Sequence, residues 1–292
     1  MSTQYTNTVL MVEPVAFAYN LQTAENNHFQ QNDFADSAQV QMLAYAEFQA
    51  MVSLLRSKGI AVLILKDTLE PHTPDSIFPN NWFSFHGSKA AIYPMYAPNR
   101  RLERRACVFE LSKEAGYLVD TIKDYSSYEK QQHFLEGTGS MILDRVNKIA
   151  YAALSERTDK GLFHTFCSDF DFFPVSYVAN QTVGEERLPI YHTNVQLCVA
   201  DNYAVVCLDA IDNKAEREHL VTTLLQSGKE LIEITEVQMH QFAGNMLQVS
   251  NSQGETFLVM SQTAHRSLTE QQINKLESYN KLLVAAVPTI EK

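Results

Sequence analysis

Five stretches of the chain space their apolar residues three or four positions apart, as in helices with one buried face. The first stretch shows the pattern best, with Val40, Leu43, Ala44, Phe48, Met51, Val52 and Leu55 on one face. The five predicted helices span Asp36–Gly59, Asn99–Gly116, Arg157–Cys167, Asn213–Gly228 and Ser267–Leu283. Strand-like apolar runs follow four of them, at Ile60–Leu65, Phe172–Val178, Leu231–Ile234 and Val284–Ile290. After the second helix the strand signal is weaker, near Tyr117–Ile122.

The predicted helices begin near positions 36, 99, 157, 213 and 268, so one recurs every 55–63 residues. Strands are predicted before them at Thr8–Glu13, Trp82–Tyr93, Ser140–Ala152, Val195–Leu208 and Met246–Met260. The last three contain hairpin breaks at Asn147, Asp201-Asn202 and Ser250-Asn251-Ser252. Near-constant spacing predicts repeated units in one domain, at about 1–70, 71–130, 131–180, 181–238 and 239–292. Five such units, each with one helix, could close into a ring with strands inside and helices outside.

Composition narrows the class of protein. With 292 residues, 45% hydrophobic and 20% charged, the chain is typical of a globular protein. The net charge of −11 argues against a nucleic-acid partner. Neither a signal peptide nor a membrane span is expected. Four cysteines without paired spacing favour a reduced, cytoplasmic protein.

The stretch Phe134–Arg145, FLEGTGSMILDR, carries the first candidate chemistry. Glu136 enters a Gly-Thr-Gly bend, and glycines allow the close backbone approach that would set an acid at the lip of a cavity. Arg145 follows nine residues later, which suits two groups at opposite ends of one strand, each facing one end of a small polar ligand. A hairpin with a solvated Glu136 is the alternative.

Three further segments place polar groups beside predicted strands. Asn80 and Asn81 lie in PDSIFPNNW, where a capped turn is the alternative explanation. The arginines of APNRRLE stand at a helix start, a position whose dipole favours anions, so they are either exposed or held for an anionic ligand. His192 in YHTN could act as a general acid or base. No histidine shows metal-ligand spacing, so no metal site is predicted.

Together, PDSIFPNN, APNRRLE, FLEGTGSMILDR with LSERT, YHTN and FAGNMLQV resemble the guanidino-group modifying superfamily. That superfamily contains arginine deiminases, dimethylarginine dimethylaminohydrolases and amidinotransferases, and the likeness is strongest to the bacterial citrulline-utilisation hydrolases. The resemblance spans nearly the whole chain. It implies an α/β fold, a five-bladed propeller (pentein) of ββαβ units, which agrees with the repeat spacing.

The resemblance also implies roles for particular residues. The catalytic histidine corresponds to His192, and the acid that holds the substrate's terminal nitrogen corresponds to Glu136. Carboxylate-binding arginines correspond to Arg101 and Arg145, and an acid near the substrate's α-amine corresponds to Asp75. No cofactor is implied, the partner is a small amino-acid substrate, and whether the protein forms a homo-oligomer is left open.

Two departures from the family pattern bear on the substrate. Guanidine-processing relatives usually carry a carboxylate at the position of Asn81, and often an aspartate at that of Gly139. A buried guanidinium without a carboxylate is costly, whereas a neutral ureido group needs only hydrogen bonds, which an amide can donate and accept. Asn81 therefore favours citrulline over arginine. Whether Asn80 or Asn81 faces the ligand is left open.

A third departure concerns the nucleophile. The family places a cysteine in a glycine-rich C-terminal segment, which is expected to begin where this sequence reaches Lys292. The four cysteines at 107, 167, 198 and 207 are expected to be small buried hydrophobes instead. The predicted function is hydrolysis of citrulline to ornithine, ammonia and carbon dioxide by a Cys-His-Glu mechanism. The alternatives are an arginine deiminase-like guanidine hydrolase and a non-catalytic amino-acid binding protein.

Overall fold

The sheets of this mixed α/β structure repeat one small pattern. The computed structural model describes residues 3–24, 26–27, 29 and 37–292. Four three-stranded sheets share one order, in which the first two strands are antiparallel and the third is parallel to the second. They are β3 (Phe83–His86), β4 (Lys89–Ile92) and β5 (Thr121–Asp124); β6 (Ile142–Asp144), β7 (Ile149–Ala153) and β8 (Phe173–Tyr177); β11 (Leu197–Val199), β12 (Tyr203–Val206) and β13 (Glu230–Glu233); and β14 (Leu247–Ser250), β15 (Thr256–Ser261) and β16 (Lys281–Ala285).

Two smaller sheets differ from this pattern. β1 (Thr8–Glu13) and β2 (Ala61–Lys66) form a parallel pair, joined through helix α1 (Ser37–Ser57). Among the described residues β1 pairs along its length with β2 alone, so this sheet lacks the antiparallel strand that the other four contain. A separate hairpin, β9 (Asn180–Val183) and β10 (Glu186–Pro189), lies between the third and fourth units.

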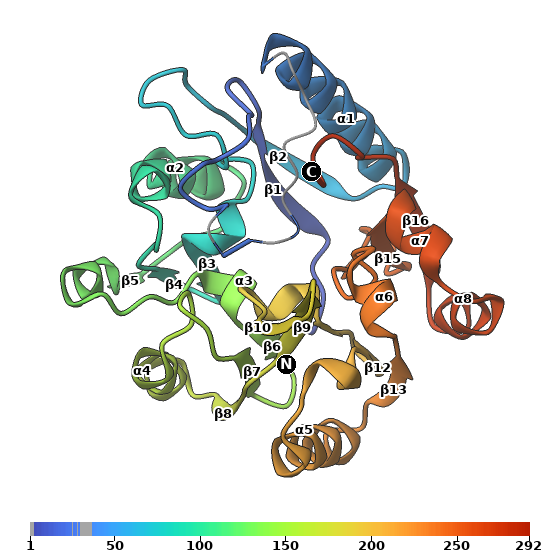
Figure 1. The fold of residues 1–292 in the computed structure, drawn as a ribbon. Coiled ribbons are helices and arrows are strands. Elements are labelled where there is room, and N and C mark those ends of the chain that lie inside the picture. Colours follow the sequence, from blue (N-terminus) through green and yellow to red (C-terminus); the bar gives the residue numbers. More distant parts are fainter. Residues whose placement is uncertain (1–2, 25, 28, 30–36) are drawn as a thin grey trace.

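Helices connect the parallel strands and lie outside the sheets, as Figure 1 shows for α1, α2, α4, α5 and α8. The bounds of the helices other than α1 are α2 (Cys107–Glu114), α4 (Lys160–Phe170), α5 (Lys214–Gln226), α6 (Glu236–Met239), α7 (Gln262–Ser267) and α8 (Glu270–Glu277). Helix α1 buries Val40, Ala44, Phe48, Val52 and Leu55, which confirms the apolar face predicted for it. Its predicted start at Asp36 lies outside the described residues.

Three of the five predicted helices have wrong boundaries. The second helix is interrupted, because Arg104 is extended and separates the 3₁₀ turn η2 (Pro98–Glu103) from α2. The third begins at Lys160, where Asp159 caps the backbone N–H of Leu162 at 2.8 Å, which leaves Arg157 outside the helix. The fifth ends at Glu277, and Leu283 belongs to β16.

The predicted start of the fourth helix is confirmed, since the Asn213 side chain accepts from the backbone N–H groups of Ala215 and Glu216. The hairpin breaks at Asn147, Asp201-Asn202 and Ser250-Asn251-Ser252 are also confirmed. The first two lie between the antiparallel strands of their sheets, and the third begins at the last residue of β14 and continues into the turn before β15. No helix in the described part of the chain is long and apolar enough to cross a membrane.

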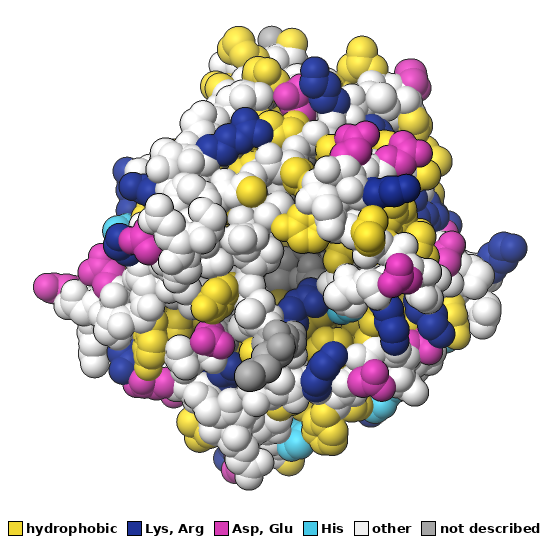
Figure 2. Space-filling model, turned by 180° about the vertical axis from the view of Figure 1, so that it is seen from behind, with side chains coloured by type: hydrophobic (Ala, Val, Ile, Leu, Met, Phe, Trp, Pro, Cys, Tyr) yellow, Lys and Arg dark blue, Asp and Glu magenta, His cyan; other side chains and the backbone are white. Residues whose placement is uncertain are grey.

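Short helical turns precede the first strand of three of the four repeated sheets. They are η1 (Pro79–Asn81) before β3, α3 (Gly137–Ser140) before β6, and η4 (Thr193–Val195) before β11. Turn α3 packs against both η1 and η4, so residues from three units meet at this end of the first strands. The face opposite that of Figure 1 is hollowed near its middle, with Lys and Arg side chains beside the hollow (Figure 2).

Candidate active site

Glu136 lies immediately before turn α3 and has no solvent exposure. Its Oε2 is 2.7 Å from Nε2 of His192 and 3.5 Å from Nη1 of Arg157, and the backbone N–H of Tyr96 donates to Oε1 at 2.9 Å. Glycine is required at the next position, since Gly137 has φ +47° and a Cβ there would collide with the carbonyl oxygen of Asn80. The bend predicted around Glu136 therefore buries this acid, and the solvated alternative is wrong.

His192 immediately precedes turn η4, and its side chain is 5% exposed. Burial lowers the pKa of His192 to about 4; the charges of Arg157 and Arg100 act in the same direction, and Glu136 opposes them. Burial would raise the pKa of Glu136, but Arg157 and His192 outweigh burial and lower it. At neutral pH the pair is therefore a carboxylate and a neutral imidazole. Because Nε2–H donates to Glu136, the unprotonated nitrogen of His192 is Nδ1.

Asn81 and Gly139 complete the surroundings of that nitrogen. A Cβ on Gly139 would collide with Nδ2 of Asn81 and would lie 2.8 Å from Nδ1 of His192. Asn81 is 4% exposed, whereas Asn80 is less buried and turns its carbonyl toward Thr138 at 3.4 Å. Of the two asparagines, the structure therefore brings Asn81 to His192. The glycine that departs from the family pattern leaves the space in which these two side chains meet.

Of the two arginines in the APNRRLE segment that the sequence offered for an anionic ligand, Arg100 enters the site, whereas the resemblance assigned the role to Arg101. Arg100 is 3% exposed, donates from Nη1 to Oδ1 of Asn81 at 2.8 Å, and pairs with Glu103 at 2.8 and 3.0 Å. Oδ2 of Asp75 lies 3.9 Å from Nε of Arg100 and accepts from Nδ2 of Asn20 at 2.7 Å. The structure therefore brings Asp75 to the same buried cluster as Asn81.

Arg157 is an arginine that sequence reasoning missed, although it belongs to the quoted LSERT segment. It is 2% exposed, and besides Glu136 it donates to the carbonyl of Thr23 at 2.9 Å and from Nε to the side chain of Asn26 at 2.9 Å. Its guanidinium lies 5.0 Å from the ring centre of Tyr191. The signal that could have found Arg157 was its place in LSERT, one of the segments that carry the family resemblance.

The structure does not bring Arg101 or Arg145 to this cluster. Arg101 donates to the carbonyls of Met95 and Tyr96 at 2.9 and 3.0 Å, and its side chain is 30% exposed. Arg145 follows β6, at the opposite end of that strand from Glu136, and donates to the carbonyl of Phe85 at 3.1 Å. Burial lowers the pKa of the Arg145 guanidinium.

The four cysteines occupy other parts of the fold. Cys167, Cys198 and Cys207 are buried as predicted, but the same prediction is wrong for Cys107, which is exposed at the start of α2. Burial raises the pKa of Cys167 and Cys198 to about 12 and that of Cys207 to about 11, so these thiols are poor nucleophiles. Within the described part of the chain, no group of three or more His, Cys, Asp or Glu could hold a metal ion.

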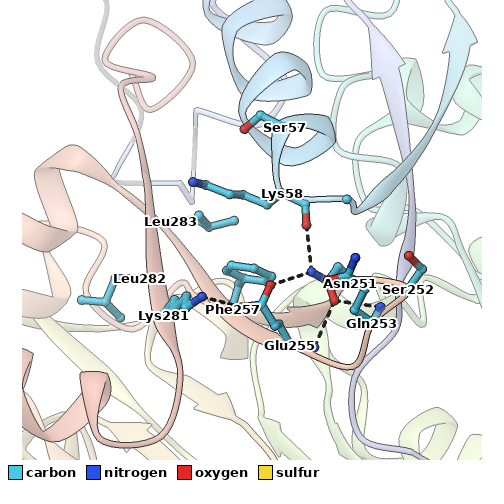
Figure 3. Close-up of a pocket in the computed structure, with 11 residues that line it drawn as sticks. Ser57, Lys58, Asn251, Ser252, Gln253, Glu255, Phe257, Lys281, Leu282 and Leu283 are labelled. Carbon is cyan, nitrogen blue, oxygen red and sulfur yellow. Dashed lines mark hydrogen bonds and ion pairs between the residues drawn. The ribbon is translucent and has the colours of Figure 1, made fainter.

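A cavity of about 480 Å³ lies elsewhere, between the end of α1 and the turn that joins β14 to β15 (Figure 3). Its central side chain, Asn251, donates to the carbonyl of Lys58 at 3.0 Å and to Glu255 at 2.9 Å, and Lys281 pairs with Glu255. These polar groups hold the turn to the end of α1, so we interpret the cavity as part of a structural contact between these two elements.

Comparison with known proteins identifies the family. A family model described as eukaryotic N,N dimethylarginine dimethylhydrolase matches residues 13–292. No curated protein sequence matches the chain.

Among solved structures, AgrE in complex with L-arginine has a TM-score of 0.73 and 16% identity, covering 97% of this chain and 38% of AgrE. The substrate-bound N-terminal domain of ArgZ, a cyanobacterial arginine dihydrolase, has a TM-score of 0.70 and 17% identity, covering 97% and 93%.

A citrulline complex of DDAH from Pseudomonas aeruginosa has a TM-score of 0.65 and 12% identity, covering 99% of this chain and 96% of that one. Both the Pseudomonas DDAH and the ArgZ domain were crystallised as cysteine-to-serine variants. The chain also spans 38% of the longer ArgZ chain. At sequence identities of 12–17%, the similarity to these structures shows a shared fold. The chain belongs to the N,N dimethylarginine dimethylhydrolase family, within the guanidino-group modifying (pentein) superfamily that its motifs resemble.

Proposed function

We propose that the protein hydrolyses a C–N bond of a ureido or guanidino amino acid, with citrulline as the leading substrate. One observation carries the proposal: the Glu136 carboxylate and the neutral His192 are joined at 2.7 Å beside the amide of Asn81. A carboxylate, an imidazole with a free nitrogen and an amide together suit a planar neutral group that both donates and accepts hydrogen bonds.

In the proposed mechanism a cysteine thiol gives its proton to Nδ1 of His192, and the thiolate attacks the ureido carbon. Glu136 holds the terminal nitrogen of the substrate and stabilises the imidazolium that forms. His192 then protonates the leaving amine and afterwards takes a proton from the attacking water. Citrulline and water would give ornithine, ammonia and carbon dioxide, without a cofactor.

The geometry favours Arg157 for the α-carboxylate of the substrate. Its guanidinium is buried beside Glu136, and its other described acceptors are the neutral oxygens of Thr23 and Asn26. Asp75, held by Asn20 and close to Arg100, would bind the α-amine. The same role for Arg101 and Arg145 remains a prediction from the resemblance, with less geometric support.

The source of the thiol follows from the repeat. Turns before β3, β6 and β11 carry the site, yet the β1–β2 sheet lacks the corresponding antiparallel strand among the described residues. We propose that a segment outside residues 1–292 adds this strand to β1 and carries the cysteine in the turn before it. Ile290 supports this placement, because Ile290 and Phe78, which is next to the η1 turn, pack against the same buried cluster of Phe17, Val40 and Ala44. On this view the five sheets are the blades of a pentein propeller.

Two other functions have specific support. A guanidine hydrolase is favoured by the family match and by the fold shared with AgrE, which was solved with L-arginine. A non-catalytic amino-acid binding protein is favoured by the positions of the four cysteines. A cytoplasmic location remains a prediction from the cysteine pattern.

Turnover and binding separate these functions. Residues 1–292 would be titrated with citrulline, arginine and dimethylarginine by calorimetry, and ornithine formation would be followed by mass spectrometry. We expect citrulline to bind, without turnover, and turnover to appear in a form extended through the next cysteine. Turnover by residues 1–292 alone would make one of the four cysteines the nucleophile. Tighter binding of arginine would favour the guanidine hydrolase, and binding without turnover by the extended form would favour the binding protein.

A further inference from the structure

We infer that Arg100 is a positioning residue: it fixes the side-chain amide of Asn81 so that its NH₂ group, and not its oxygen, faces the reacting end of the ligand. The inference rests on the proposed function and names the chemical group that the site selects. Arg100 would thereby favour a ureido carbonyl over a guanidinium without touching either.

The argument begins with the symmetry of an amide. The oxygen and nitrogen of a carboxamide have nearly the same shape, so the partners decide which end points where. A guanidinium can only donate hydrogen bonds. With Nη1 of Arg100 at 2.8 Å, the nearer atom of Asn81 must be the acceptor Oδ1, because a rotated amide would set two donors against each other. Nδ2 then lies on the other side, over Gly139.

Arg100 is itself held firmly. Its Nε and Nη2 donate to the two carboxylate oxygens of Glu103 at 2.8 and 3.0 Å, and Nη2 also lies 3.2 Å from the carbonyl of Phe78. Arg100 and Glu103 are each 3% exposed. Swinging the guanidinium away would leave a buried carboxylate unpaired, which is costly. The orientation of Asn81 is therefore imposed by a rigid, two-point ion pair.

The result is an asymmetric site. On one side is the Glu136 carboxylate, 2.7 Å from His192, which can also accept from an NH₂ group of a ligand. On the other side Asn81 offers N–H donors beside Nδ1 of His192. A ureido group presents NH₂ to the first and C=O to the second, whereas a guanidinium would place its own N–H against the N–H of Asn81. A buried donor left without an acceptor penalises the wrong ligand.

The test compares four ligands: citrulline, arginine, and their decarboxylated forms N-carbamoylputrescine and agmatine. Calorimetric titration of residues 1–292 gives the ratio of dissociation constants for the ureido and guanidino member of each pair. In Arg100→Met the amide can rotate, so we expect the preference for the ureido ligand to fall about tenfold in both pairs. If Arg100 instead bound the α-carboxylate, both amino acids would weaken together and the decarboxylated pair would not change, which would overturn the inference.

Three further variants show that the effect passes through Asn81. Arg100→Lys keeps a donor-only cation and should restore part of the preference. In an Asn81→Ala background, Arg100→Met should leave the ratio unchanged. Arg104→Met is the matched control, since Arg104 contacts Glu129 and the carbonyl of Tyr93, and it should not alter the ratio.

Should Arg100→Met fail to fold because Glu103 is left unpaired, Arg100→Met with Glu103→Leu removes both charges and keeps the test. Absence of binding by the unmodified chain would count against the proposed function. Normal binding with a ratio indifferent to Arg100→Met would count against the orienting role alone.

Discussion

The two ends of the first strands carry the same kinds of residue in different surroundings. At one end His192 lies 2.7 Å from Oε2 of Glu136, and Arg157 lies 3.5 Å from the same oxygen. At the other end His86, the last residue of β3, lies 3.3 Å from Nη1 of Arg145. Both histidines have lowered pKa values, His192 to about 4 and His86 to about 3, because both are buried near arginines.

What separates the two ends is the carboxylate. His86 bonds to the hydroxyl of Ser84 at 2.6 Å and packs on Phe170 with ring centres 4.5 Å apart, and the charges that act on it are those of Arg145 and Lys148. Without an acid in these contacts, that end is an aromatic and hydroxyl cluster suited to holding β3 against α4. At the Glu136 end an acid orients the imidazole and can stabilise its charged form, which is what proton transfer requires. A His–Arg pair alone is therefore no sign of a site.

The largest expected effect comes from removing that carboxylate. Glu136→Gln leaves Arg157 without its buried acid, so the free energy of unfolding should fall by about 3–5 kcal/mol. Urea unfolding measures the loss, and titration with citrulline should show no binding. Glu156→Gln, an exposed acid in the same segment, is the control and should change neither quantity. If the Glu136→Gln variant were fully stable and still bound citrulline, the carboxylate would not be what distinguishes the Glu136 end from the His86 end.

The arginines at the two ends should differ next most strongly. Arg157→Gln should weaken citrulline by about 10- to 150-fold, because a charge-assisted hydrogen bond contributes about 1.5–3 kcal/mol. N-carbamoylputrescine, which lacks the carboxylate, should lose much less. Arg145→Gln should leave both affinities unchanged. The reverse pattern in calorimetry would return the carboxylate role to Arg145, as the sequence resemblance implies.

Adding a single methyl group at Gly139 tests whether the open space at the Glu136 end has a function. Gly139→Ala should push Asn81 or His192 out of place, since its Cβ has no room between them, and overpacking costs about 1–3 kcal/mol. We expect weaker citrulline binding together with a lower midpoint of unfolding. Gly161→Ala in α4 is the control, because its nearest neighbour would be Asp159 at 3.3 Å. Equal behaviour of the two variants would show that the gap at Gly139 has no function.

Acid should act on the histidine of the site. With the pKa of His192 lowered to about 4, the folded state binds fewer protons than the unfolded state between pH 6.5 and 4, so stability is lost as the pH falls through this range. From pH 7 to pH 5 this one group should cost about 2 kcal/mol. Urea unfolding at the two pH values measures the change. His192→Gln should remove this share of the dependence while His86 keeps its own. An unaltered dependence would mean that the pKa of His192 is the same in the folded and unfolded states.

The sequence alone determined the repeat and the buried face of α1, and its resemblance to a known family singled out Glu136 and His192. Helical spacing of apolar residues follows from local geometry, so α1 and its buried face could be read directly. The glycines after Glu136 marked a bend in the chain, but the roles of Glu136 and His192 came from the family resemblance. Their 56-residue separation along the chain says nothing of the 2.7 Å between them.

Only the tertiary structure decided which arginines face the site. Arg100 and Arg101 are adjacent, yet a 3₁₀ turn points one into the buried cluster and leaves the other partly exposed. Arg145 and Arg157 are separated by one hairpin, and the strand direction of β6 carries Arg145 to the wrong end while the chain returns Arg157 beside Glu136. The direction of a side chain at a turn is set by packing between units that are distant in the sequence. The local pattern of residues does not encode that packing.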